Sequence, residues 1–289
     1  MKPIPEFSQK NKAFWACVRS VSQNLGYSKR KKGGAEGELF IHNIEDIVRA
    51  FNNLGLNPDK IFSEGNPTQL GIDLQTYFAA RADILTNHIR PRLMDAADAR
   101  KLFQEQFEKL RPNCPIPMNK QKGDKRAESF LTGLVNMTIE AEIGNLPCDY
   151  DPLALATVTQ DGLPLMTMAR RVDGAFPSPI NPIAIWEIKE YYYTTTFGSR
   201  VADGVYESLL DGMELEELDS RSEIRIKHYL IVDSAFTWWT CGKSYLCRIF
   251  DMLHMGYVDE VLFGREVVEE LPRIVSEWIE TYRSLEAAH

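Results

Sequence analysis

The sequence predicts a mixed α/β protein of α+β type, in which a mostly helical N-terminal part precedes a core built on a central sheet. Apolar residues recur at helical spacing through about the first 115 residues, and no strand-like run appears before about residue 150. Beyond that point, short runs rich in β-branched and aromatic residues alternate with amphipathic helical stretches. This alternation is typical of a sheet with parallel pairing and helices packed against it.

The composition is that of an ordinary soluble globular protein, with 44% hydrophobic and 26% charged residues in a chain of 289. We expect a cytoplasmic protein with no membrane partner. The N-terminus lacks an apolar signal, no apolar run is long enough to span a membrane, and the five cysteines are scattered. The net charge of −8 argues mildly against a nucleic-acid binder, although basic groups can still cluster on one face.

A run of four cations separates the first two predicted helices. One helix is expected over residues 7–25, and the next begins at Asn43, a residue type that caps helices. The cations between them are Lys29, Arg30, Lys31 and Lys32. A flexible basic arm of this kind can follow a phosphate backbone without fixed geometry, so the four are candidates for nucleic-acid contact. A solvated loop is an equally good interpretation of the same run.

A domain boundary is predicted at residue 118, because three prolines fall between Arg111 and Met118. It divides the chain into a mostly helical subdomain, 1–118, and a core, 119–289. A second basic patch opens the core and is a further candidate for nucleic-acid contact: Lys120, Lys122, Lys125 and Arg126.

The core is predicted to begin with a helix, a hairpin and a further strand. The helix covers about residues 125–143. Asp161-Gly162 between two apolar runs is a strong hairpin signal, so we expect a return strand over 163–172 that ends at Asp173. The run from Pro182 to Lys189 is the best strand candidate in the chain.

After this strand the sequence predicts helices that alternate with two more strands. The first helix starts near Ser199 and is expected to end at Gly212, with the acidic run 213–219 as a solvated loop. The elements expected after it are a strand at 224–232, a helix at 244–255, a strand at 258–263 and a last amphipathic helix.

Two opposite charges end the apolar strand. Side chains alternate along a strand, so Glu187 and Lys189 share one face while Ala184, Trp186 and Ile188 share the other. An unpaired charge in a buried place costs several kcal/mol, so the pair needs partners or a function. We expect this face to open into a cleft, with Asp173 on the neighbouring strand.

The pattern Asp173, then Glu187-Ile188-Lys189, resembles the PD-(D/E)xK nuclease superfamily, and the order of elements over about residues 120–280 looks like a type II restriction endonuclease. Val172 stands where such enzymes usually carry a proline. The resemblance implies a restriction-endonuclease-like mixed central sheet flanked by helices. It also implies Mg²⁺-dependent hydrolysis of double-stranded DNA at a specific sequence, with Mn²⁺ as a possible substitute.

The resemblance also assigns roles to the residues. Asp173, Glu187 and the backbone carbonyl of Ile188 would hold the metal, and Lys189 would orient the attacking water and offset charge on the phosphate. Glu140 is the preferred supporting metal ligand, although a solvated helical glutamate is the commoner case. A palindromic site would call for a homodimer. No glycine-rich phosphate-binding motif occurs, so no nucleotide cofactor is expected.

Three alternatives stay open. The chain could be a non-cleaving DNA-binding or regulatory protein on the same fold, or a DNA-repair-type nuclease. In the third, Glu187 and Lys189 pair with charges on neighbouring strands, and the protein is an interaction module.

Overall fold

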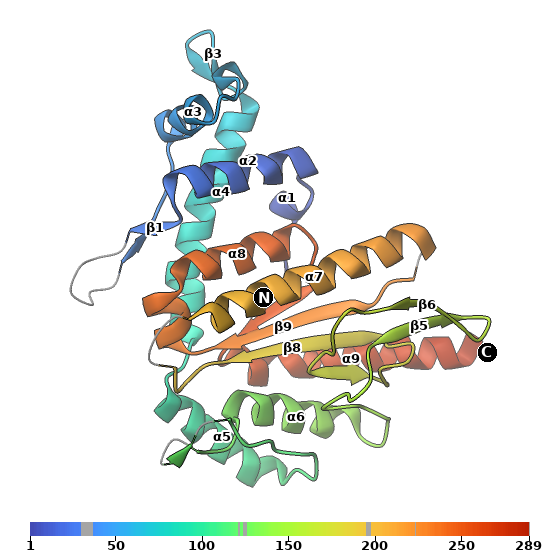
Figure 1. Cartoon of the computed structure of the whole chain (residues 1–289). Helices are drawn as coiled ribbons and strands as arrows, with labels where there is room; N and C mark the ends of the chain where they lie inside the picture. The colour runs from blue at the N-terminus through green and yellow to red at the C-terminus, as the bar shows by residue number, and fades with distance from the viewer. Residues whose placement is uncertain (30–36, 121, 124–125, 195–197, 223, 289) are drawn as a thin grey trace.

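The computed structural model describes residues 1–29, 37–120, 122–123, 126–194, 198–222 and 224–288. Within these ranges the fold is mixed α/β: a helical N-terminal part rises from a four-stranded sheet that has helices on both faces (Figure 1). The mixed α/β class expected from the sequence is confirmed. Among the described helices, none has both the length and the apolar character that a membrane span requires.

The described residues of the N-terminal part form four α-helices and two very short strand pairs. Asn11, Asn43 and Thr68 each accept a backbone N–H with their side chains, which fixes the starts of α2, α3 and α4. The elements are α1 (Pro5–Ser8), α2 (Lys12–Leu25), β1 (Ser28–Lys29), β2 (Glu38–Leu39), α3 (Ile44–Asn53), β3 (Phe62–Ser63), β4 (Asn66–Pro67) and α4 (Gln69–Ile84).

The main sheet has the strand order β10-β9-β8-β7. β7 runs antiparallel to β8, whereas β8, β9 and β10 are parallel to one another. Each parallel step is made through a helix, α7 and then α8, as crossovers between parallel strands require. The bounds are β7 (Gly174–Phe176), β8 (Ala184–Glu190), α7 (Ser199–Ser222), β9 (Lys227–Asp233), α8 (Lys243–His254) and β10 (Glu260–Phe263).

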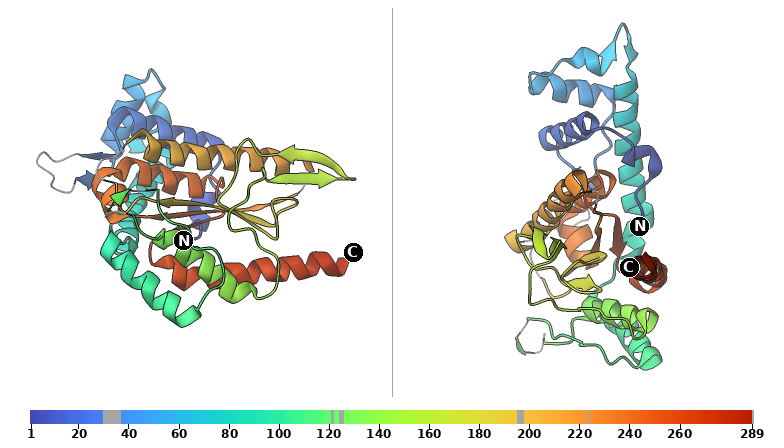
Figure 2. Two further views of the ribbon diagram at one scale, coloured as in Figure 1. Left: turned by 60° about the horizontal axis from the view of Figure 1, so that its bottom comes forward. Right: turned by 90° about the vertical axis from the view of Figure 1, so that its right-hand side faces the viewer.

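The two faces of the sheet carry different helices, as the views in Figure 1 and Figure 2 show. α7 and α8 cover one face, where α8 also meets the N-terminal helices in a shared hydrophobic core. On the other face α6 packs on α9 and on α5. The hydrophobic core on this face contains Trp186 of β8 stacked on Trp278 of α9. These three helices are α5 (Ala96–Leu110), α6 (Phe130–Ile143) and α9 (Glu266–Ala288).

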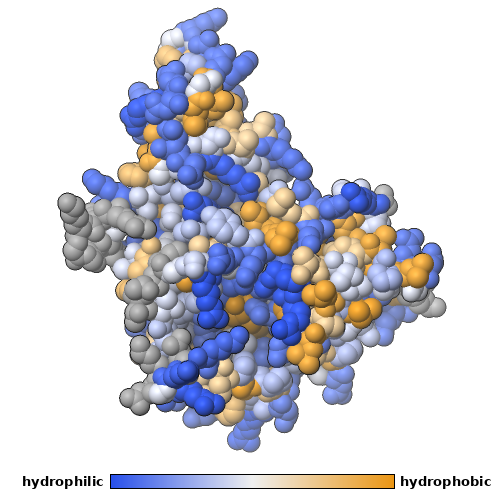
Figure 3. Space-filling model, viewed as in Figure 1, coloured by the Kyte–Doolittle hydropathy of each residue, from blue (hydrophilic) through white to orange (hydrophobic). Residues whose placement is uncertain are grey.

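The hairpin expected at Asp161-Gly162 is present, and it joins β5 (Thr157–Gln160) to β6 (Leu163–Thr167). Both turn residues have positive φ, 51° and 79°, as a two-residue hairpin turn of this type needs. The pair forms a separate sheet, and its exposed leucines contribute to the apolar surface seen over this part in Figure 3.

The return strand does not reach Asp173, so that part of the prediction was wrong. β6 ends at Thr167. The N–H of Ala169 then donates to Glu214 on α7, and the N–H of Asp173 donates to the Trp186 carbonyl of β8. The chain therefore leaves the hairpin and joins the main sheet just before β7. The hydrogen bond from Asp173 to Trp186 places Asp173 beside β8.

α7 continues through Gly212 for ten more residues, which corrects the predicted helix end. A Cβ at Gly212 would lie 2.3 Å from the Tyr257 carbonyl oxygen. Glycine is needed there because the helix passes close to another backbone. Leu215 and Leu218 in the acidic run are buried, so the run forms an amphipathic helix end.

Candidate active site

Asp173 lies beside Glu187 at the start of β7. Gly174 pairs with Trp186 across the antiparallel strands, and one step further the register sets Asp173 against Glu187. The Asp173 Oδ2 atom accepts the backbone N–H of Ile188 at 2.7 Å. This bond fixes the carboxylate next to the Glu-x-Lys segment, as the sequence pattern predicted.

The alternation predicted along β8 is also present. Trp186 and Ala184 pack in the core under α6 and α9, whereas Ile185 packs on the α7 side of the sheet. Glu187 and Lys189 share the α7 side, where Lys189 contacts Glu207 of α7 at 3.0 Å.

Glu187 is fully buried and is held by two cations. Arg170 donates to both of its oxygens, at 2.8 Å to Oε1 and 3.1 Å to Oε2, and Lys189 Nζ donates to Oε2 at 2.9 Å. Burial alone would raise the pKa of Glu187, but the Lys189 ammonium and the Arg170 guanidinium outweigh it and lower the pKa. Glu187 is therefore an ionised carboxylate with its orientation fixed.

Two acids of α7, Glu207 and Asp211, contact the cations of this site from above the sheet. Glu207 accepts from Lys189, and Asp211 Oδ2 accepts from Arg170 at 2.7 Å. Asp211 is buried, and its Oδ1 atom has no hydrogen-bond partner among the described residues. Burial, with the Glu187 carboxylate adding, raises the pKa of Asp211 to about 7 despite the contact with Arg170. We call Arg170, Asp173, Glu187, Lys189, Glu207 and Asp211 the ion cluster.

Solvent reaches the ion cluster at Asp173, at Glu207 and in part at Arg170. Asp173 is exposed to solvent, yet neighbouring protein atoms partly desolvate its carboxyl group. This desolvation, followed by the Glu187 carboxylate, raises the pKa of Asp173 to about 6. Lys189 is only 8% exposed. Burial would lower its pKa, but the Glu187 carboxylate raises it, so Lys189 is a cation.

The charges of the ion cluster do not cancel. Four carboxylates face two cations, so full ionisation leaves an excess of two negative charges, which a divalent cation would neutralise. Asp173 has one oxygen without a hydrogen bond among the described residues, and Glu187 Oε1 accepts a single donor and keeps one acceptor position. Hard oxygen donors of this kind fit Mg²⁺ or Mn²⁺.

The donor set is nevertheless small. Within the described ranges no group of three or more His, Cys, Asp or Glu side chains is arranged to hold a metal. A cation at Asp173 and Glu187 would need a backbone oxygen, such as that of Ile188, and water to complete its shell. It would also share Glu187 with Arg170.

Glu140 does not join the pair. Its carboxylate accepts the N–H of Asn113 at 2.9 Å, and α6 lies on the face of the sheet opposite to Glu187. The structure thus gives Glu140 a partner in the segment after α5 and shows no hydrogen bond between Glu140 and Asp173 among the described residues.

The expected nucleic-acid contacts are only partly within the described residues. Lys29 is exposed in β1, and Lys120, Lys122 and Arg126 are exposed before α6. Arg30, Lys31, Lys32 and Lys125 lie outside the described residues. Figure 1 places β1 by the N-terminal helices and the segment before α6 next to α5.

Arg170, Glu207 and Asp211 were not identified from the sequence. Glu207 and Asp211 are four residues apart, a spacing that puts both on one face of a helix. Arg170 is three residues before Asp173, with nothing local to show that it contacts Glu187. Only the fold brings these residues together.

Two family models cover most of the chain. Residues 1–88 match a model described as Domain of unknown function (DUF7690), and residues 94–278 match one described as Domain of unknown function (DUF7687). No curated protein and no solved structure matches the chain. The two matches meet between residues 88 and 94, and residue 118, where the sequence predicts a boundary, lies inside the second match. That second match spans more than half of the chain and contains the whole ion cluster, so the chain belongs to the DUF7687 family.

Proposed function

We propose that the protein is a Mg²⁺-dependent endonuclease of the PD-(D/E)xK type that cuts double-stranded DNA at a specific sequence. The observation that carries the proposal is the convergence of three side chains at one end of the sheet. Asp173 faces Glu187 across β7 and β8, and Lys189 lies 2.9 Å from Glu187.

The order of elements supports the same proposal. α6 precedes the strands, β7 and β8 are antiparallel neighbours, and α7 follows the Glu-x-Lys strand and packs across the sheet. This order is the one that the resemblance to restriction endonucleases implies.

The chain's own residues have distinct tasks in this proposal. Asp173, Glu187 and the Ile188 carbonyl would hold the cation, which when bound would polarise the phosphate and lower the pKa of a water. Lys189 keeps its proton and offsets the charge that develops on the attacked phosphate. Arg170 holds Glu187 in one orientation, so that the carboxylate does not need to reorganise.

DNA would contact two groups of cations. Lys29 to Lys32, and the group from Lys120 to Arg126, are the proposed phosphate contacts. Cutting a palindromic site on both strands would require a symmetric homodimer.

The test is cleavage of supercoiled plasmid DNA by the purified protein with Mg²⁺, with Mn²⁺ and with a chelator. We expect discrete fragments with either metal and intact plasmid with the chelator. Asp173→Asn and Lys189→Ala should abolish cleavage while DNA still shifts in a gel. The control is Glu140→Gln on the opposite face, which should cut normally. Cleavage by Lys189→Ala at the wild-type rate would refute the role of Lys189.

A second candidate is a DNA-binding protein that does not cleave. The observation that favours it is that two cations, Arg170 and Lys189, already bind the Glu187 carboxylate, which leaves less of it for a metal ion. Lys189 is also almost completely buried. The same experiment separates the candidates, because shifted but uncut plasmid supports the binder. Smeared products would support a DNA-repair-type nuclease.

A further inference from the structure

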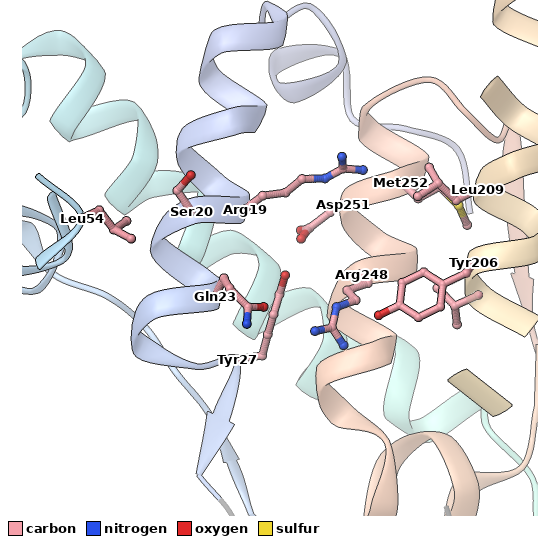
Figure 4. Close-up of a pocket in the computed structure, with 11 residues that line it drawn as sticks. Arg19, Ser20, Gln23, Tyr27, Leu54, Tyr206, Leu209, Arg248, Asp251 and Met252 are labelled. Carbon is pink, nitrogen blue, oxygen red and sulfur yellow. The ribbon is translucent and has the colours of Figure 1, made fainter. Parts of the chain in front are cut away.

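A pocket of about 490 Å³ lies between α2, α7 and α8, where the two family-matched regions meet (Figure 4). Its volume is within the range of small-molecule sites, roughly 300–1,000 Å³. The polar side chains that line it include Arg19 and Gln23 of α2, Tyr27 just after α2, Tyr206 of α7 and Arg248 of α8.

Two guanidinium groups give the pocket its charge. Arg19 and Arg248 both line it, and neither forms an ion pair with a carboxylate among the described residues. Arg248 lies 4.7 Å from the ring centroid of Tyr27 and 4.6 Å from that of Tyr245. These cation–π contacts hold Arg248 in place before any ligand arrives.

Asp251 is the one acid among the described residues that line the pocket, and it is already neutralised. Asp251 is buried, and its carboxylate accepts two hydrogen bonds from Arg81, at 2.9 and 3.1 Å, and one from the Tyr77 hydroxyl at 2.6 Å. Arg81 is itself 1% exposed and also donates to Ser22. The floor is thus a closed, neutral network, and Arg19 and Arg248 leave the pocket positive.

The rest of the lining suits a planar ring. Tyr206 presents an exposed aromatic ring, and Val205, Leu209 and Met252 add apolar surface, whereas the Tyr27 ring is already covered by guanidinium groups. The Gln23 amide can both donate and accept hydrogen bonds, as the edge of a nucleobase requires. Figure 4 shows Gln23 and Tyr27 on one side of the pocket and Tyr206 and Arg248 on the other.

We propose that this pocket binds a nucleotide. The two guanidinium groups bind the phosphate, because planar guanidinium groups match phosphate oxygens in charge and geometry. The aromatic and apolar side chains hold the base. A free nucleotide and one nucleotide of a nucleic-acid strand present the same chemistry. Binding of either kind does not require that the protein be a nuclease.

The pocket also borders the ion cluster through α7. Tyr206 lines the pocket, while the next residue, Glu207, contacts Lys189. A Cβ at Gly204, one turn before Glu207, would lie 3.1 Å from the Lys189 side chain, so this turn of α7 packs closely on Lys189. A ligand in the pocket therefore rests on the same helical turn that closes the candidate active site.

The test is calorimetric titration of the full chain with four probes: AMP, adenosine, inorganic phosphate and a short single-stranded DNA oligonucleotide. AMP should bind more tightly than adenosine or phosphate, each of which lacks one half of the ligand. Arg19→Ala and Arg248→Ala should each weaken binding about tenfold, the usual effect of losing one charged hydrogen-bond partner. Arg248→Lys should weaken it less, because it keeps the charge but loses the stacked plane. Arg100→Ala, at an exposed position of α5, is the matched control.

The probes also distinguish a free nucleotide from a nucleotide that belongs to a nucleic-acid strand. Binding of AMP indicates a free nucleotide, whereas binding of the oligonucleotide alone, weakened by the same variants, indicates a nucleotide of a strand. Phosphate that binds as tightly as AMP, or affinity unchanged in both arginine variants, would overturn the proposal, as would no binding of any probe. Thermal unfolding of each variant checks that it folds. Gln23 is exposed, and Gln23→Ala should shift the preference between AMP and GMP, with GMP titrated as a fifth probe.

Discussion

Arg170 donates to both oxygens of the Glu187 carboxylate, and the same guanidinium reaches Asp211 on α7 at 2.7 Å. One side chain thus joins the central strand β8 to the helix that covers it. Glu187 and Asp211 are both fully buried, and Arg170 compensates the charge of both, with Lys189 adding a second cation at Glu187.

Removing that cation should destabilise the fold. We expect Arg170→Ala to lower the free energy of unfolding by about 3 kcal/mol, because it leaves buried carboxylates short of a partner. Urea unfolding measures the change. The neighbouring Arg171→Ala, at an exposed position, should change stability by less than about 0.5 kcal/mol. Equal stability of the two variants would contradict the structural role of Arg170.

Stability should fall as pH rises from 5 to 8. The pKa values of Asp173 and Asp211 are raised to about 6 and about 7, and those of Glu190 and Asp233 to about 7, chiefly by burial. The folded state therefore holds more protons than the unfolded state in this window, and the free energy of unfolding decreases as they are lost. The lowered pKa of Glu187 contributes in the opposite direction, but only at lower pH, as that carboxylate becomes protonated.

Urea unfolding at pH 5 and pH 8 measures this slope. Asp211→Asn should make it shallower, whereas Asp219→Asn, at an exposed position of the same helix, should leave it unchanged. A slope of the opposite sign for the wild type would contradict the raised pKa values of the buried carboxyls, and an unchanged slope in Asp211→Asn would contradict the share of Asp211.

A divalent cation should stabilise the folded state. The ion cluster has two excess negative charges at pH 8, so Mg²⁺ at about one hundred times its Kd should add about 2.7 kcal/mol to the free energy of unfolding. Thermal unfolding with and without Mg²⁺ measures the effect. Asp173→Asn should abolish the Mg²⁺ effect, and Glu140→Gln should retain it. The same increase in Asp173→Asn would place the ion elsewhere.

Glu190 should stabilise the start of α6. Its carboxylate accepts the N–H groups of Phe130, Leu131 and Thr132 at 3.0–3.1 Å, while Ser129, at the usual capping position, forms no such bond. Burial raises the pKa of Glu190 to about 7, so the effect is best measured at pH 8. Glu190→Ala should cost about 2 kcal/mol. Ser129→Ala should cost much less, and the reverse order would show that the local residue is the cap.

Much of the local structure could be predicted, because local rules govern it. The Asp161-Gly162 hairpin follows from two residues that tolerate positive φ, and the faces of β8 follow from strand alternation. The end of α7 could not be predicted, since Gly212 usually signals a helix end and its contact with Tyr257 is a tertiary feature.

The residues of the candidate site also form two groups: those that the sequence could identify and those that it could not. The pattern of Asp173, Glu187 and Lys189 could be identified because it occupies two short segments that pair as neighbours. Arg170 and Asp211 could not, because their partners depend on how the chain leaves the hairpin and on where α7 crosses the sheet. The nuclease activity itself is a proposal that rests on the resemblance and on this geometry.

The hydrophobic core that α8 shares with the N-terminal helices has a consequence for how the two family-matched regions coexist. Phe7, Trp15 and Tyr77 pack in one continuous apolar cluster with Phe250 and Leu253. Removal of residues 1–88 would expose the apolar residues of α8 to solvent, and the remaining fragment would be prone to aggregate. The two regions are thus one cooperative unit that should melt in a single transition, although their sequences are matched separately.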